Sequence, residues 1–326
     1  FFTVVDRAKT SLVPLETVAR EVKRGFTTGA NDFFYLTEEE IHRAGIERRF
    51  WMHKNEHGEW TPNYLVKSPR ECESVTVNVE NLKYRVLMIH DEREELRGTK
   101  ALKHIKWGEN RGFPERPTCR GRQRWYDLGA WEKPDFIWAD AYNDRYAVFA
   151  TPNALADKRF FYIYVTDPTY RLLLFGYLNC SLIPLFIDVN GITNLGEGAI
   201  YTNVYQLKRL PVPSPENDVA GLSEVMDRLS NRPVLSIFDE LGTRDPQEVT
   251  FDTVREDRRE LDRIIMGDIL HLTESEQLDV YRSVIDIVRS RLDRASSVNT
   301  ADKRRDIDVN AAADSILTRL KEESEK

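Results

Sequence analysis

The sequence has few cysteines and no long apolar segment. Cys72, Cys119 and Cys180 stand far apart among 326 residues, and none belongs to a Cys-x-x-Cys pair. This pattern excludes a disulfide scaffold and does not favour a cysteine-based zinc site. The longest uncharged run, residues 172–187, is shorter than the ~20 residues that span a bilayer, so it predicts a buried helix.

Several sequence signals of enzymes and of export are also missing. There is no Gly-x-x-x-x-Gly-Lys-Ser/Thr phosphate loop and no Gly-x-Ser-x-Gly elbow. His53 and His57 are four residues apart, but their neighbours do not fit the zinc-helix motif, which predicts a pair of exposed loop histidines. No secretion signal opens the chain, so we expect a reducing, cytoplasmic location. The chain begins Phe1-Phe2 without Met, which we interpret as a piece of a longer protein or a chain without its disordered start.

Charge is distributed unevenly along the chain. The net charge of −7 by itself argues against nucleic-acid binding, but residues 221–326, with 17 basic and 24 acidic side chains, account for all of it. Segment 97–124 instead carries nine basic and two acidic residues, with four aromatic residues in or beside it. This mixture suits a phosphate backbone with base or sugar contacts, and a solvated basic loop is the alternative. The basic residues are Arg97, Lys100, Lys103, Lys106, Arg111, Arg116, Arg120, Arg122 and Arg124, and the aromatic ones are Trp107, Phe113, Trp125 and Tyr126.

Two regions meet at the prolines of segment 210–215. Three prolines in five residues do not fit a helix or a central strand, so the segment predicts a linker or turn between domains 1–216 and 217–326. Before it, runs of alternating, β-branched and aromatic residues predict strands among short helices and long loops, which is an α+β globule. These strands are expected at 74–79, 84–89 and 160–165.

The second region is predicted to be all-helical. Residues 273–276 form a capping box ahead of an apolar seam with near-heptad spacing, and a last helix is expected at roughly 309–322. Because the balance is acidic, we expect these helices to pack against the first region or a catalytic part, with a dimer seam as the alternative. The apolar residues are Leu261, Ile264, Ile265 and Ile269 on one helical face, and Leu278, Tyr281, Ile285, Val288 and Leu292 along the seam.

One tetrapeptide comes close to a catalytic motif. Asp167-Pro168-Thr169-Tyr170 resembles the Asp-Pro-Pro-Tyr motif of amino-methyltransferases, which holds the target amine and stacks on a flipped base. The nearest glycine loop, Gly196-Glu197-Gly198, begins only 26 residues later, which is too few for the strand–helix units of a cofactor fold. We therefore interpret both as turns, and predict no catalytic residue, no metal site and no S-adenosylmethionine pocket in this chain.

The most specific stretch is Gly25-Phe26-Thr27-Thr28-Gly29-Ala30-Asn31-Asp32-Phe33-Phe34-Tyr35-Leu36. It resembles the opening signature of the target-recognition domain in N6-adenine DNA methyltransferases of restriction–modification systems, roughly Gly-Ile-x-Thr-Gly-x-Asn-x-Phe-Phe. A related pattern opens the recognition domains of type I specificity subunits. Three further pieces follow in the family's order, so that the similarity covers about residues 12–216. They are 117–128, similar to Arg-x-x-Trp-Tyr-x-Leu; 177–182, similar to Leu-Asn-Ser; and 194–213, similar to Gly-x-Gly-Ala and Leu-Pro-Val-Pro.

The resemblance implies a mixed α/β module that recognises double-stranded DNA sequence-specifically, in a type I or type IIG-like system. The family's catalytic domain normally precedes this module and is absent from the sequence, so methyl transfer and S-adenosylmethionine are expected in a separate catalytic domain or subunit. DNA and that domain are the expected partners, with no membrane, and the C-terminal helices offer a route to an oligomer. Two other functions stay open: an assembly module whose helical tail docks partner subunits, and a complete methyltransferase that uses residues 167–170.

The signature loop supplies the first predicted DNA-binding residues, which are Thr27, Thr28, Gly29 and Asn31. Gly29 can adopt a positive φ and let a partner approach the backbone. Thr28 and Asn31 can bond phosphates or base edges, but they can equally brace the loop locally. Residues 33–35 are expected in the core.

The basic segment supplies the remaining predicted DNA-binding residues. Arg120, Arg122 and Arg124 alternate, so on an extended strand they would share one face toward DNA. The alternative is that some of them pair with Glu115 or Asp127. Trp125-Tyr126 are expected in the core rather than as a stacking platform. The other predicted DNA-binding residues are Arg116, Lys103 and Lys106.

Overall fold

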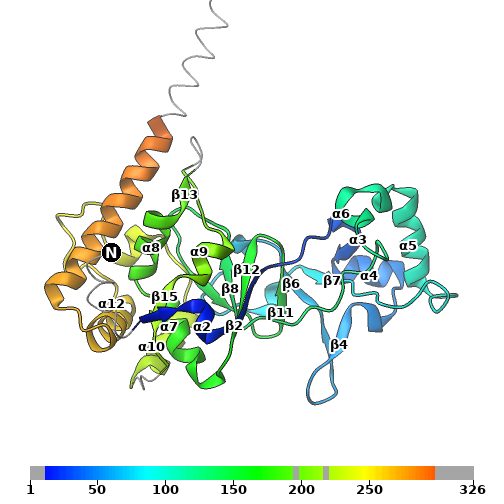
Figure 1. Cartoon of the computed structure of the whole chain (residues 1–326), viewed down its shortest axis with the longest axis horizontal. Coiled ribbons are helices and arrows are strands. Elements are labelled where there is room, and N and C mark those ends of the chain that lie inside the picture. The colour runs from blue at the N-terminus through cyan, green and yellow to red at the C-terminus, as the bar shows by residue number, and fades with distance from the viewer. Residues whose placement is uncertain (1–11, 194–197, 216–219, 298–326) are drawn as a thin grey trace, which may run out of the picture.

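The computed structural model describes residues 12–193, 198–215 and 220–297, which form an α+β fold, as predicted. Figure 1 shows a large lobe with the longest strands and the C-terminal helices, and a small lobe built around helices α3 to α6. The strands are β1 (Leu12–Pro14), β2 (Ala19–Arg24), β3 (Tyr35–Leu36), β4 (Met52–Lys54), β5 (Trp60–Pro62), β6 (Tyr64–Val66), β7 (Tyr84–Val86), β8 (Phe136–Ala139), β9 (Ala141–Tyr142), β10 (Val148–Ala150), β11 (Ala154–Ala156), β12 (Phe160–Val165), β13 (Ile192–Thr193), β14 (Ile200–Tyr201) and β15 (Pro211–Pro213). The α-helices are α2 (Leu15–Val18), α3 (Asn31–Phe34), α4 (Glu38–Ala44), α5 (Lys100–Asn110), α6 (Pro117–Arg120), α7 (Arg171–Leu178), α8 (Leu182–Asn190), α9 (Val204–Lys208), α10 (Leu222–Ser230), α11 (Ile237–Leu241), α12 (Glu256–Asp262) and a helix over 274–297. Short 3-10 turns are η1 (Arg48–Phe50), η2 (Pro69–Glu71), η3 (Val79–Asn81), η4 (Phe113–Glu115) and η5 (Pro168–Tyr170), and η6 (Arg263–Ile269) is a π-helix.

The centre of the large lobe is an antiparallel sheet with the strand order β10-β8-β12-β2. All six residues of β12 are buried, which confirms the strand predicted at 160–165. Helix α7 packs on the sheet: the ring of its Phe175 stacks on the ring of Phe136 of β8 at a centroid distance of 5.2 Å. A strand covered on both faces needs apolar residues throughout, which explains the unbroken aromatic and β-branched run.

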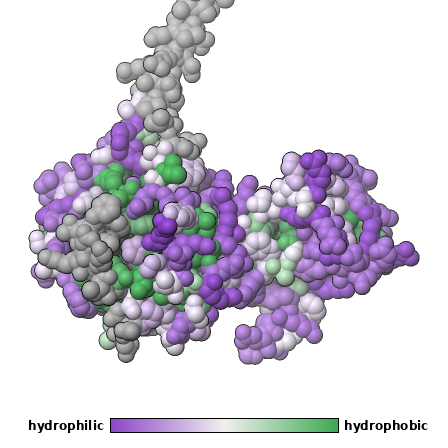
Figure 2. All heavy atoms as spheres, in the orientation of Figure 1, coloured by the Kyte–Doolittle hydropathy of each residue, from purple (hydrophilic) through white to green (hydrophobic). Residues whose placement is uncertain are grey.

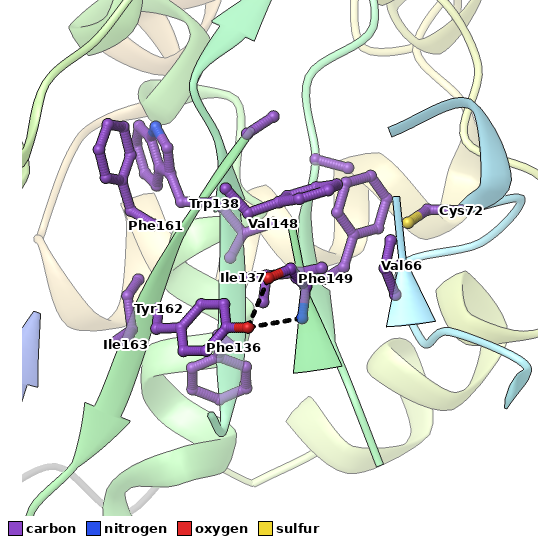
Figure 3. Close-up of a cluster of buried hydrophobic side chains, with 14 of the residues drawn as sticks. Val66, Cys72, Phe136, Ile137, Trp138, Val148, Phe149, Phe161, Tyr162 and Ile163 are labelled. Carbon is purple, nitrogen blue, oxygen red and sulfur yellow. Dashed lines mark hydrogen bonds between the residues drawn. The ribbon is translucent and has the colours of Figure 1, made fainter. Parts of the chain in front are cut away.

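A second sheet, of order β11-β6-β7-β3, leads from the large lobe into the small one (Figure 1). Its β11–β6 pair is parallel, and its other pairs are antiparallel. Figure 3 shows that side chains from both sheets, among them Val66 and Phe149, form one buried cluster. In the same cluster the hydroxyl of Tyr162 donates to the carbonyl of Ala156 and accepts from its amide, both at 2.6 Å. The two sheets therefore share one core.

The proline segment is not the linker or turn that its composition predicted. Pro211–Pro213 is strand β15, which pairs antiparallel with β1, so that Leu12 lies opposite Pro213. Proline cannot donate a ladder hydrogen bond, but a two-stranded ribbon leaves one side of each strand unpaired and can accommodate it. The ribbon joins the first described residues to the middle of the chain, and the domain boundary at 216 stays a prediction.

Two of the other predicted strands are shorter than expected or absent. Only Tyr84–Val86 of segment 84–89 is a strand. Segment 74–79 is not a strand. The backbone groups of Val75 and Val77 make a single bridge with Ala150, and η3 begins at Val79. The alternation still has a physical basis, since both valines are buried while their neighbours are not.

The uncharged run 172–187 forms two buried helices, α7 and α8, rather than one. The break falls at residues 179–181, where the Asn179 carboxamide bonds both the amide and the carbonyl of Val148. Within the described residues no single helix is long and apolar enough to cross a membrane. The pair Pro168–Asn179 and Leu182–Asn190 reaches that length and apolarity only together, with a bend of 68° between them.

The described residues after 219 are helices and loops without a strand, as predicted for the C-terminal region. Thr273 and Glu276 form the predicted capping box of the helix over 274–297, and the helix expected at 309–322 lies outside the described residues. The apolar seam faces this chain's own core, since Tyr281, Ile285 and Val288 are fully buried. These helices therefore pack against the first region, which is one of the two packings expected.

Two buried clusters of charge position the C-terminal helices, one by joining these helices to each other and the other by joining them to α8. In the first, which we call the Glu240 cluster, Glu240 receives hydrogen bonds from Arg232, at 2.7 Å to each carboxylate oxygen, and from Arg258 at 3.3 Å. In the second, Arg291 of the helix over 274–297 bonds Asp188 of α8 at 2.7 Å. Buried charges need such pairing, so both clusters specify where the helices sit.

Candidate nucleic-acid interface

The signature loop is held by contacts inside the protein. Gly25 lies where β2 meets β12, and a Cβ there would be 2.5 Å from the carbonyl oxygen of Asp157, so only glycine fits. Gly29 has φ +74°, as predicted, but a Cβ there would meet Thr118 of α6 at 2.8 Å. Both glycines therefore permit close packing of the chain on itself, and the approach of a partner to the Gly29 backbone stays a prediction.

Some side chains of the loop are buried and brace it, and others are exposed at the surface. Thr28 is 1% exposed, and its hydroxyl bonds the Asn31 side chain and accepts from the amide of Ala30 at 3.2 Å. Local bracing, the alternative that the sequence left open, therefore describes Thr28. The side chains of Thr27 and Asn31 are exposed.

The aromatic residues of the signature are core residues, as predicted. Phe33 and Phe34 are fully buried, and the hydroxyl of Tyr35 donates to Asp157 at 2.8 Å. Burial first and then the Asp157 carboxylate raise the pKa of Tyr35 far above its usual value. Asp157 was missed from the sequence because it lies about 120 residues from the signature and no local motif marks it.

Arg120, Arg122 and Arg124 do not share the face of a strand, so that prediction was wrong. Pro117 opens α6, whose last residue is Arg120, and the chain then turns, so the alternation has no strand to act on. Arg124 pairs with Asp127 at 2.6 Å, as the alternative allowed, and also with Glu92.

Arg122 and Arg116 brace the signature loop. Arg122 donates to the carbonyl of Thr27 at 2.6 Å, and Arg116 donates to the carbonyl of Gly29 at 3.0 Å. Their guanidiniums also lie over the rings of Phe34 and Phe113. These two arginines are therefore held in place by the fold, and only some N–H donors of each guanidinium remain for a partner.

Helix α5 presents several of the free cations of the small lobe. Thr99 caps its first turn and the Glu47 carboxylate accepts from the amides of Lys100 and Ala101, while Ala101 and Ile105 are buried beneath it. Lys103 and Lys106 point away from that buried face and are exposed. The helix thus holds its cations on a fixed scaffold.

Most of the basic segment is not neutralised. Seven of its nine cations are exposed, and within the described residues only Arg124 forms an ion pair. Glu109, one of the two acidic residues of the segment, is paired with Arg93 at 2.5 Å. Figure 2 shows a largely hydrophilic small lobe on the face in view. We call the following exposed cations, which make no side-chain hydrogen bond, ion pair or ring contact with described residues, the α5–α6 basic surface: Arg97, Lys100, Lys103, Lys106 and Arg120.

Aromatic rings stack beside this surface. His104 lies between the rings of Phe33 and Trp107, at centroid distances of 4.5 and 5.0 Å. Burial lowers the pKa of His104, so it is neutral at pH 7. Trp107 is 37% exposed under the guanidinium of Arg111, whereas Trp125 is buried, as predicted. One partly exposed aromatic ring thus lies within the basic segment.

The tetrapeptide at 167–170 lies in a short 3-10 turn. Asp167 caps η5, and Tyr170 is buried with its hydroxyl bonded to the carbonyl of Pro213, so the turn interpretation is confirmed. Gly198 has φ +65°, while Gly196 lies outside the described residues. In the described part of the chain no group of three or more His, Cys, Asp or Glu side chains is placed to hold a metal ion.

His53 is not the exposed loop residue that its spacing suggested. It lies on β4, where Nδ1 is 2.9 Å from Asn63 and Nε2 contacts the Lys133 ammonium. Burial lowers the pKa of Lys133 to about 8. The partners that this ammonium contacts in the described part of the chain are neutral: His53 and the side chain of Asn153.

The chain matches the family model described as the C-terminal domain of the type II methyltransferase M.Eco57I over residues 4–239. The chain belongs to this family. This agrees with the resemblance to restriction–modification methyltransferases at the level of the C-terminal domain family. No match is found among curated proteins.

The fold is similar to that of the solved structure of BpuSI. The type IIG restriction endonuclease BpuSI matches with a TM-score of 0.57 and 9% identity, over 90% of this chain and 33% of that one. The type IIL restriction–modification enzyme MmeI, solved in complex with DNA, matches with a TM-score of 0.48 and 14% identity, over 83% of this chain and 36% of that one. The chain thus spans about a third of the length of these enzymes.

Proposed function

We propose that this chain is the sequence-specific duplex-DNA recognition module of an N6-adenine DNA methyltransferase of a restriction–modification system. Methyl transfer, with S-adenosylmethionine as donor, belongs in this proposal to a separate catalytic domain in the same cytoplasmic enzyme. The observation that carries the proposal is the α5–α6 basic surface, whose cations lack partners among the described residues and stand on a buried aromatic core. Family membership supports the same assignment.

The physical reason is electrostatic. Contacts between phosphates and unpaired, solvated lysines and arginines contribute favourably to the binding free energy, because each contact releases condensed counterions from the duplex. The remainder of the chain carries the excess acid, so DNA is drawn to the small lobe and repelled by the C-terminal helices. Exposed Thr27 and Asn31 beside the surface can add hydrogen bonds to phosphates or base edges.

The test replaces Lys103, Lys106 and Arg120 together by Gln and measures binding of a random duplex by fluorescence anisotropy at several salt concentrations. Each lost phosphate contact reduces the slope of log K against log salt by about 0.9, so the triple variant should lose up to ~3 in slope. The matched control carries Arg263→Gln, Arg282→Gln and Arg294→Gln, which remove the same charge from the C-terminal helices, and it should bind as the wild type does.

Sequence reading is tested separately, by selecting random duplexes with the wild-type chain at low salt and sequencing them. Enrichment of one short motif supports a module that reads bases by itself. If the wild-type chain does not bind duplex DNA at low salt, the proposal is wrong. An assembly module would then have to use another surface, because the seam of the helix over 274–297 is covered by this chain itself.

A further inference from the structure

A second group of free arginines lies outside the α5–α6 basic surface. Arg70 belongs to η2, Arg145 follows β9, and Arg159 precedes β12. These three segments, far apart in the sequence, line one cleft of about 460 Å³ at the meeting point of the first sheet, β14 and the start of the C-terminal region. Its floor is apolar, with Ala147 and Phe149 among the lining residues.

The three guanidiniums are exposed and form no ion pair, side-chain hydrogen bond or ring contact among the described residues. Of the neighbouring carboxylates, Glu71, Asp140 and Asp157 bond other groups, whereas Asp144, next to Arg145, forms no ion pair with described residues. Glu71 accepts from the backbone amides of Lys67 and Ser68, and Asp140 pairs with Arg24 at 2.8 Å. The cations of the cleft are therefore left for an external anion.

Charge within the cleft favours an anion as well. Asp144 is the one acidic residue that lines it, against the three arginines, so the lining carries two net positive charges. A wider groove of about 1080 Å³ adjoins it and shares Arg70, Arg145 and Asp144, but that groove adds Glu71, Glu73 and Asp239. The positive site is therefore the smaller cleft alone.

The cleft is held open by backbone contacts rather than by its own side chains. The amide of Ile237 donates to the carbonyl of Asp144 at 2.7 Å, and the amide of Val234 donates to the carbonyl of Glu73 at 2.8 Å. These bonds tie the beginning of α11 to the loops that carry Arg145 and Arg70. Ser68 and Glu71 form a capping box that orients η2, and with it Arg70. A preformed site of this kind loses little conformational freedom when an anion binds.

We propose that this cleft is a second anion site that takes a phosphodiester group of the DNA backbone. The inference rests on the proposed function for the source of the phosphate, but not for the chemistry of the cleft. Three guanidinium forks can direct several donors at the oxygens of one phosphate, a geometry that arginine favours over lysine. A DNA contact here would involve the large lobe as well as the small one, and would fix the register of the module on the duplex.

The test replaces Arg70, Arg145 and Arg159 together by Gln. Duplex binding is measured against salt, beside the wild type and the control with Arg263→Gln, Arg282→Gln and Arg294→Gln. We expect the slope of log K against log salt to fall by about 1 to 3 in the cleft variant and to stay unchanged in the control. Thermal melting checks that each variant is folded, which is expected for the cleft variant because the side chains of Arg70, Arg145 and Arg159 make no bond with described residues.

A second measurement does not depend on DNA. Inorganic phosphate is titrated into the wild type, the cleft variant and the variant with Lys103→Gln, Lys106→Gln and Arg120→Gln, and binding is followed by calorimetry. Loss of phosphate binding in the cleft variant alone supports the site. If the wild type binds no duplex, the proposed function fails, and phosphate binding then decides whether the cleft takes free phosphate instead of DNA. A folded cleft variant that matches the wild type in both duplex and phosphate binding overturns the inference.

Discussion

The Glu240 cluster makes a quantitative prediction about stability and pH. Glu240 is 3% exposed, and burial alone would raise the pKa of its carboxyl group. Arg258 and Arg232 outweigh burial and lower this pKa from 4.5 to about 2. Replacing Glu240 by Gln keeps the shape of the side chain and removes the carboxylate charge with which Arg258 is paired, whereas Arg232 keeps Asp257.

The magnitude follows from the difference between the folded and unfolded pKa. The folded value lies below the unfolded one, so the folded state binds this proton more weakly, and the stabilisation is complete above about pH 4.5 and is lost as the pH falls toward 2. A shift of about 2.5 units corresponds to about 3 kcal/mol, since each unit is worth about 1.4 kcal/mol. Leaving Arg258 without its carboxylate partner costs a similar amount, because a buried charge that loses its partner is destabilising.

The assay is urea unfolding followed by circular dichroism between pH 7 and pH 2. At pH 7 the Glu240→Gln variant should have a free energy of unfolding about 3 kcal/mol below the wild type, and this difference should shrink between pH 4.5 and 2. The control is Glu94→Gln, because Glu94 is exposed and its carboxylate makes no ion pair or hydrogen bond with described residues; it should follow the wild-type curve at every pH. A Glu240→Gln curve that stays parallel to the wild type over the whole range would refute the reasoning.

Three further predictions concern the small lobe and its base. Gly29→Ala should lower the melting temperature more than Gly112→Ala. Both glycines have φ near +70°, but only at Gly29 would the added Cβ lie within 3 Å of another side chain. Equal decreases in melting temperature would show that the contact with α6 is unimportant. Arg122→Gln should destabilise the fold by about 1–3 kcal/mol in urea unfolding, since it leaves two backbone carbonyls without their donor, whereas Arg120→Gln should not; the reverse order would contradict the bracing role. The pKa of Lys133 is about 8 in the folded state and 10.5 in the unfolded state, so the unfolded state binds this proton more tightly. The free energy of unfolding of the wild type, relative to Lys133→Gln, should therefore rise between pH 8 and 10.5, and a difference that does not depend on pH would contradict this.

Local patterns in the sequence determined much of the fold. The α+β class, the buried strand over 160–165, the capping box at Thr273 and the apolar seam after it all follow from the spacing of apolar residues and from helix-capping chemistry. The burial of the aromatic residues of the signature was likewise predictable, because Phe33 and Phe34 are large, adjacent apolar residues. Such features depend on neighbours a few residues away, which a single sequence contains in full.

The candidate site was predictable only in part, because a charge pattern locates cations without showing their partners. Segment 97–124 is indeed a source of free cations, but the sequence could not show that Arg122 and Arg116 hold the signature loop while Lys103 and Lys106 remain unpaired. The expected strand at 120–124 failed because alternation implies a shared face only where a partner strand exists, and here the chain turns after α6.

Only the tertiary structure decided which distant residues meet. Pro211–Pro213 became a strand because β1, about 200 residues earlier, lies beside it. Strand pairing, which no local signal specifies, also places Asp157 within hydrogen-bond distance of Tyr35. In the same way it brings Arg70, Arg145 and Arg159 together in the lining of one cleft. The sequence by itself determined which residues prefer the core, the helix and the surface, since these preferences are local. The contacts between distant segments, which set the charges left free for a partner, depend on the global packing of the chain.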